Sequence, residues 1–132
     1  CESLLAIGQH PKEKSDTVTV LEKIGHFLDV ENDRLYAKFK SEGFSKPEIS
    51  TKISEQLDLV SVLQKSANKW DGGYVMAGLI GHGDAFVLRD PNGIRPAFWY
   101  EDDEICVVAS ERPVIQTAFN LKVEQINEFD RE

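Results

Sequence analysis

The apolar residues in the first half of the chain, residues 1–70, recur at the spacing of amphipathic helices. A first helix is expected to start at Ser15 or Asp16, since either side chain can cap it. A second is expected to start at Asn32 or Asp33 and to end near Gly43, a good residue after a helix. The apolar positions of the two helices are Val20, Leu21, Ile24, Phe27, Leu28, Leu35, Tyr36 and Phe39.

A third helix is indicated by Ser45-Lys46-Pro47-Glu48, which has the pattern of a capping box with proline in the first turn. Ile49, Ile53 and Leu57 then repeat at four-residue intervals and predict one apolar face. A further short helix is expected from Leu59 to about Ser66.

From Asp71-Gly72-Gly73 onward the pattern changes from helices to strands. Residues 74–80 and 85–88 flank a glycine-rich turn, and residues 97–100 and 105–109 flank an acidic turn that we expect to be exposed. Each pair predicts an antiparallel hairpin. A short helix with Pro113 in its first turn is expected over residues 110–119, and a weak last strand over residues 121–126.

These elements predict an α+β fold, with residues 1–70 mostly helical and residues 71–132 forming an antiparallel meander plus one short helix. The strand over residues 74–80 is apolar at both alternating positions, a pattern typical of sheets buried on both faces. A meander of this size cannot easily cover both of its own faces. We therefore expect the chain to be one part of a larger domain.

Composition narrows the classes of function. The 132 residues include 15 basic and 23 acidic side chains, a net charge of −8, and the basic residues form no stripe, which argues against nucleic-acid binding. The apolar runs are far shorter than the ~20 residues of a membrane span, and no secretory signal is visible. Cys1 and Cys106 are too few for a disulfide framework, so a reduced, cytoplasmic protein is expected.

A rigid corner is expected between the two hairpins. Asp90-Pro91 and Arg95-Pro96 fix φ at two points, and Gly93 allows a positive φ between them. Arg89, Asp90 and Arg95 could form an anion site, but ion pairs and backbone hydrogen bonds that hold the corner together are the favoured interpretation. His10, His26 and His82 do not have the spacing of metal ligands.

The corner also carries a resemblance. The segment Arg89-Asp90-Pro91-Asn92-Gly93-Ile94-Arg95-Pro96, followed by Ala109-Ser110-Glu111, resembles the class II, N-terminal-nucleophile glutamine amidotransferase domains, and most closely those of the amidophosphoribosyltransferases. Residues 6–11 and Ser15-Asp16-Thr17 extend the resemblance over most of the chain. It implies part of an α/β/β/α sandwich of the N-terminal-nucleophile hydrolase type.

The resemblance implies a reaction in two steps. The parent enzyme hydrolyses glutamine at a cysteine and transfers the ammonia to phosphoribosyl pyrophosphate in purine synthesis. A separate transferase domain binds that second substrate, with Mg²⁺. No cofactor is expected in the present chain. The expected partners are glutamine, the remainder of the glutaminase domain and the transferase domain. Self-association is also expected, because sheet surface is left uncovered.

The resemblance assigns one substrate contact to this chain. Asp16 matches the family aspartate that binds the α-ammonium of glutamine, whereas the residues alone favour a helix cap or a first-turn acid. Arg89, Asp90, Pro91, Gly93, Arg95, Pro96, Ser110 and Glu111 are carried over as a structural signature only.

No catalytic residue is assigned to the chain. Cys1 is followed by Glu2 rather than the family's glycine, and only 14 residues separate it from Asp16, where the family has three further motifs. The nucleophile is therefore expected upstream. The alternative is a non-catalytic binding or regulatory module that keeps the glutaminase scaffold.

Overall fold

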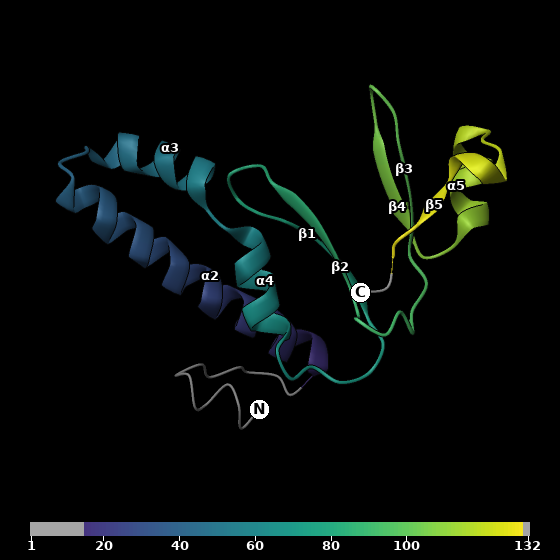
Figure 1. The fold of residues 1–132 in the computed structure, drawn as a ribbon, viewed down its shortest axis with the longest axis horizontal. Coiled ribbons are helices and arrows are strands. Elements are labelled where there is room, and N and C mark those ends of the chain that lie inside the picture. Colours follow the sequence, from purple (N-terminus) through teal and green to yellow (C-terminus); the bar gives the residue numbers. More distant parts are fainter. Residues whose placement is uncertain (1–14, 131–132) are drawn as a thin grey trace. The chain divides into compact units, whose positions relative to one another are not determined.

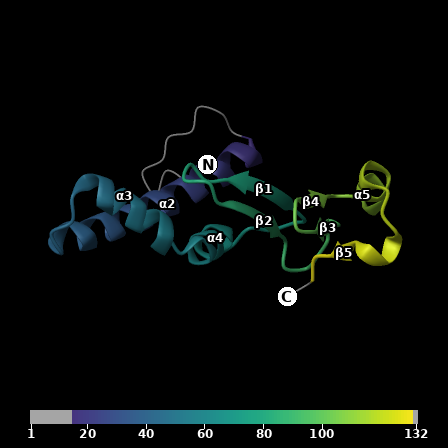
Figure 2. The same cartoon turned by 90° about the horizontal axis from the view of Figure 1, so that it is seen from above.

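Helices occupy most of the described residues up to Trp70, and all of the strands come after it. The computed structural model describes residues 15–130 and is α+β, as expected (Figures 1 and 2). The chain divides into two units between Trp70 and Asp71. The first contains α2 (Asp16–Ser41), α3 (Lys46–Gln56) and α4 (Leu59–Ala67). The second contains β1 (Val75–Leu79), β2 (Ala85–Arg89), β3 (Phe98–Glu101), β4 (Cys106–Ala109), α5 (Arg112–Phe119), the 3₁₀ helix η1 (Val123–Gln125) and β5 (Asn127–Glu128).

Helix α2 is continuous, so the expectation of two helices with a break near Asn32 and Asp33 was wrong. Asparagine and aspartate each cost a helix interior less than about 1 kcal/mol, and no proline stands there to stop it. Arg34 also donates to the Glu31 carboxylate at 2.9 and 2.7 Å, which joins adjacent turns across the expected break.

The two ends of α2 follow local rules. Ser15 is the N-cap, and its Oγ accepts a hydrogen bond from the Val18 N–H at 3.3 Å. At the other end Gly43 has a φ of +87°. The N–H of Gly43 donates to the Lys40 carbonyl at 3.1 Å and that of Phe44 to the Phe39 carbonyl at 3.2 Å. These two bonds form a Schellman motif, so the prediction of a helix end near Gly43 is confirmed.

Helix α3 turns back along α2 (Figure 1) and shares a core with it. Its predicted start is confirmed, because the Ser45 N–H donates to the Glu48 carboxylate at 2.8 Å and Pro47 lies in the first turn. Buried Ile49 packs with Leu35 and Phe39 of α2. The partly buried residues packed against this cluster are Tyr36, Phe44, Ile53 and Leu57.

Helix α4 packs against the earlier part of α2. Asp58 caps it by accepting from the Ser61 N–H at 3.0 Å, and Val62 and Leu63 form its buried face. Lys23 of α2 donates to the Asn68 carbonyl at 2.9 Å, just beyond the end of α4. This hydrogen bond ties the end of α4 to α2.

The second unit begins with the hairpin of β1 and β2, which is antiparallel as predicted. Its register pairs Val75 with Arg89 and Leu79 with Ala85, and Gly83 in the turn has a φ of +112°. A Cβ on Gly78 would lie 2.5 Å from the ring of its cross-strand partner Phe86. The aromatic ring thus covers the glycine that it faces.

The other strands form a separate sheet in the order β4-β3-β5. Strands β3 and β4 are antiparallel, as predicted, and pair Phe98 with Ala109. The expected continuous meander was wrong, because the corner diverts the chain and β2 does not pair with β3. The expected strand over residues 121–126 was also wrong: η1 lies there, and only Asn127 and Glu128 pair with β3.

Helix α5 packs against β3 and β4 (Figure 2) and begins with Pro113 in its first turn, as predicted. The core of this unit contains Ala97, Ile115 and Ile126. The strand residues are at most partly buried, and Leu79 is 83% exposed. Within residues 15–130, no helix combines the length and apolar character that a bilayer crossing requires.

Candidate functional site

The corner between β2 and β3 is organised around the carboxylate of Asp90, which is only 2% exposed. It accepts hydrogen bonds from the N–H groups of Ile94 (2.9 Å), Arg95 (3.2 Å) and Tyr74 (3.3 Å). Burial by itself raises the pKa of Asp90, but these bonds and the positive charge of Arg89 together lower it below the ordinary value. The charged carboxylate is therefore the form that holds the corner.

Arg89 closes the same corner from its other side. Its guanidinium donates to the carbonyls of Arg95 at 2.7 Å and Gly93 at 3.1 Å. It also donates to the Phe129 carbonyl and, at 3.1 Å, to the Glu128 carboxylate, which anchors the end of the chain beside β3. Arg89 and Asp90 thus serve the corner itself, as the favoured interpretation of the sequence had it, and neither is left to bind an anion.

The turn inside the corner uses Pro91 and Gly93 as the sequence indicates. The Gly93 N–H donates to the Asp90 carbonyl at 2.9 Å, and Gly93 has a φ of +62°. Only a residue that tolerates the left-handed region suits that position. The turn thereby fixes the course of the backbone into Arg95 and Pro96.

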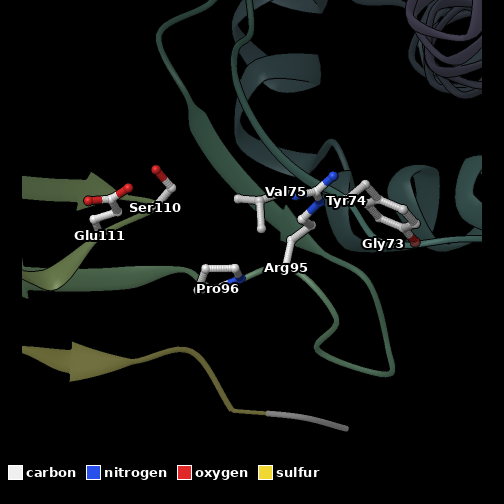
Figure 3. A pocket seen from close by; sticks show the side chains of 7 residues that line it. All are labelled: Gly73, Tyr74, Val75, Arg95, Pro96, Ser110 and Glu111. Carbon is white, nitrogen blue, oxygen red and sulfur yellow. The ribbon is translucent and has the colours of Figure 1, made fainter.

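A pocket of about 470 Å³ lies beside this corner (Figure 3). Three segments that are separate in the sequence line it. These are the start of the β1 hairpin, the end of the corner, and the residues between β4 and α5. The lining residues are Gly73, Tyr74, Val75, Arg95, Pro96, Ser110 and Glu111. The structure therefore brings four residues of the signature, Arg95, Pro96, Ser110 and Glu111, to one place.

The residues that line the pocket are positioned by the strands and the helix that flank them. Ser110 and Glu111 directly follow the pairing of Ala109 with Phe98, and Glu111 is the N-cap residue of α5. The next residue, Arg112, lies over the Phe98 ring at 4.8 Å from its centroid. On the opposite wall, burial and, to a lesser extent, the Asp90 carboxylate raise the pKa of the Tyr74 phenol.

No pattern in the sequence indicated a site at Gly73, Tyr74 or Val75. Their signal was the Asp71-Gly72-Gly73 stretch before β1, which indicated only a change to strands. The structure gives Gly73 a further reason to be glycine, because a Cβ there would meet the Ile94 side chain. Close approach of two backbone segments is a requirement that no local pattern reveals.

The substrate contact expected at Asp16 lies in the first turn of α2, where the side chain is exposed. Because Ser15 is the N-cap, Asp16 is not needed for that task. Its carboxylate has no hydrogen bond or ion pair to another of residues 15–130.

The cysteine and the histidines among residues 15–130 do not come together in one site. Cys106 is a free, exposed cysteine at the start of β4, and His82 lies 2.8 Å from the Asp84 carboxylate in the first hairpin turn. His26 lies within α2. Among residues 15–130, no group of three or more histidine, cysteine or acidic side chains is arranged to hold a metal ion. Cys1, His10 and residues 6–11 lie outside the described residues.

No protein-family model, curated protein or solved structure matches this chain.

Proposed function

We propose that this chain is part of the glutaminase domain of an amidophosphoribosyltransferase, with Asp16 as a ligand of the glutamine α-ammonium. In this proposal the cysteine nucleophile lies upstream, the complete domain is an α/β/β/α sandwich, and the enzyme is cytoplasmic. The ammonia released from glutamine is transferred to phosphoribosyl pyrophosphate, which a separate domain binds with Mg²⁺.

The observation that carries the proposal is the set of residues from Arg89 to Pro96, together with Ser110 and Glu111. The corner gives several of these residue types a physical reason. Asp90 must be an acceptor for backbone N–H groups, and Gly93 must adopt a positive φ. Arg89 must donate to several acceptors at once. The signature is thus a linked set of requirements on one corner of the backbone.

The exposed carboxylate of Asp16 is the second support. An ammonium group is best bound by a carboxylate through a charge-assisted hydrogen bond. Asp16 is exposed to solvent in the first turn of α2, and Ser15, not Asp16, caps the helix.

The test uses the full gene product that contains this chain, assayed with glutamine and, separately, with free ammonia. Hydrogen bonds to charged groups contribute about 1.5–3 kcal/mol, so Asp16→Asn should lower the glutamine-dependent kcat/KM about ten- to a hundredfold. The ammonia-dependent activity should be unchanged. Asp29→Asn, at another exposed acid of α2, is the matched control and should leave both activities intact. Equal losses in both assays would show that Asp16 acts only through folding.

The rival proposal is a non-catalytic module that keeps the scaffold. It is favoured by one observation, that none of the described pocket residues is a cysteine or a histidine. Both proposals expect the 132-residue chain alone to release no ammonia from glutamine. They differ in the full gene product, where glutamine-dependent formation of phosphoribosylamine supports the enzyme and its absence supports the module.

A further inference from the structure

We propose that Asn92 is a site of spontaneous deamidation, and that the corner between β2 and β3 controls the rate of this modification. The reaction needs only water, so it does not depend on the glutaminase proposal. It concerns the turn from Asp90 to Gly93 rather than the pocket beside it.

Asn92 is the one asparagine of the chain that is followed by glycine. In this reaction the backbone nitrogen that follows an asparagine attacks the asparagine side chain. A glycine hinders that nitrogen least, because it has no Cβ and adopts more backbone conformations than any other residue. The Asn92 side chain is exposed and has no hydrogen bond to another of residues 15–130. Both the residue pair and its exposure therefore suit the modification.

The chemistry exchanges one amide for an acid. The Gly93 nitrogen loses its proton and bonds to Asn92 Cγ, the bond from Cγ to Nδ2 breaks, and ammonia leaves. Water then opens the five-membered imide. Opening at Cγ leaves an ordinary aspartyl residue. Opening at the backbone carbonyl leaves an isoaspartyl linkage, in which the main chain runs through Cβ and Cγ.

The corner restrains the peptide that must react. The Gly93 N–H donates to the Asp90 carbonyl at 2.9 Å, and the Gly93 carbonyl accepts from Arg89 at 3.1 Å. The next residue is held as well, because the Asp90 carboxylate accepts from the Ile94 N–H at 2.9 Å. An N–H in such a bond loses its proton less readily, and a residue bonded at both its N–H and its carbonyl cannot turn toward Asn92 Cγ. Deamidation therefore requires local opening of the corner.

The product cannot rebuild the same turn. An isoaspartyl linkage adds one carbon to the backbone before Gly93, which displaces the Gly93 N–H from the Asp90 carbonyl. Either product also places a new carboxylate two residues from the buried carboxylate of Asp90. Like charges disfavour each other, and the buried one cannot move into solvent without breaking its backbone hydrogen bonds. Modification of Asn92 should therefore weaken the corner permanently.

The test follows the conversion of Asn92 in the folded 132-residue chain and in a synthetic peptide of residues 86–98, at one mildly alkaline pH. Peptide mapping by mass spectrometry measures loss of the amide, and near-ultraviolet circular dichroism establishes that the chain is folded. The folded chain should convert at least about tenfold more slowly than the peptide. Asn127, also exposed but followed by Glu128, is the internal control and should stay unconverted over the same time.

Variants that weaken the corner should accelerate the reaction. Asp90→Asn and Arg89→Lys remove different contacts of the turn, and each should raise the rate in the chain about fivefold or more. The asparagine introduced by Asp90→Asn precedes Pro91, which has no backbone N–H, so it adds no second site of this kind. Asp103→Asn, at an exposed acid of another turn, should leave the rate at Asn92 unchanged. Arg89→Lys keeps the positive charge and provides the test if Asp90→Asn unfolds the chain.

Conversion should also lower the melting temperature, in proportion to the fraction of chains modified at Asn92. Asn92→Gln should resist this loss, because a glutamine must close a larger ring. The proposal is overturned if the peptide does not convert, if the folded chain converts as fast as the peptide, or if neither corner variant raises the rate. Converted chains that keep the native melting temperature would overturn it as well.

Discussion

Gly73 lies so close to Ile94 that a Cβ atom on Gly73 would be 2.6 Å from Ile94 Cγ2. The start of the β1 hairpin therefore contacts the corner through bare backbone, and Gly73 also lines the pocket. No φ restriction applies at Gly73, so the requirement for glycine there is purely one of space.

Gly73→Ala should destabilise the second unit by about 1–3 kcal/mol, the usual cost of overpacking. Gly81 is the matched control, because a Cβ there meets nothing within 4 Å. Gly81→Ala should change the free energy of unfolding by no more than about 0.5 kcal/mol. Urea denaturation of both variants measures the difference, and equal stabilities would contradict the close contact.

Asp90→Asn should destabilise the corner more than Asp103→Asn does. An asparagine keeps the shape, but its NH₂ group would face backbone N–H donors that now meet a carboxylate oxygen. Asp103 is an exposed acid in the second hairpin turn and serves as the control. Thermal unfolding followed by near-ultraviolet circular dichroism measures both changes, and an unchanged melting temperature in Asp90→Asn would contradict this role.

The same residue predicts a dependence on pH. The pKa of Asp90 is lower in the folded protein than its ordinary value of 3.8, so its contribution to stability is complete only well above that value. That contribution is lost as the pH falls through the lower, folded pKa. Unfolding measured from neutral to acidic pH should therefore show a steeper loss in the native chain than in Asp90→Asn. Parallel curves would show that the charge is not what holds the corner.

Alanine substitutions at two glycines of the first unit should change the free energy of unfolding in opposite directions. Gly25 lies inside α2 with open space around it, so Gly25→Ala should stabilise the helix by about 0.5–1 kcal/mol. Gly43 has a φ of +87°, so Gly43→Ala should cost about 1–2 kcal/mol. Urea denaturation distinguishes the two, and a gain in stability from both would show that Gly43 does not end the helix as described.

The chain alone should self-associate at tens of micromolar. Leu79 is 83% exposed on β1, and the β1–β2 sheet has two strands, so both of its outer edges lack a strand partner within the described residues. Leu79→Lys should shift sedimentation toward the monomer because a charge opposes burial of that surface. A native chain that sediments only as a monomer would count against this expectation.

The sequence alone determined the local elements of this protein. The capping box of Ser45 and Glu48, the helix end at Gly43 and the two hairpins all appear as predicted. Each depends on residues only a few positions apart, so a short window of sequence contains the whole interaction.

Tertiary structure decided which elements join and where the charges lie. The sequence did not reveal that α2 would continue past Asp33, because interior asparagine and aspartate cost too little to end a helix. Nor did it reveal the two sheets, or η1 in place of a last strand. At the start of η1 the Lys122 N–H donates a hydrogen bond to the Gln125 side-chain oxygen at 2.9 Å, which favours the turn over a strand.

The contacts of Arg89 and Arg95 could not be predicted from the sequence either. Arg89 donates to the Phe129 carbonyl, 40 residues later, and its other donors bond groups of the corner. Arg95 is exposed beside the pocket. Both belong to one short motif and look alike in the sequence. Only the folded chain separates them, because the difference depends on which distant backbone carbonyls come within hydrogen-bond distance.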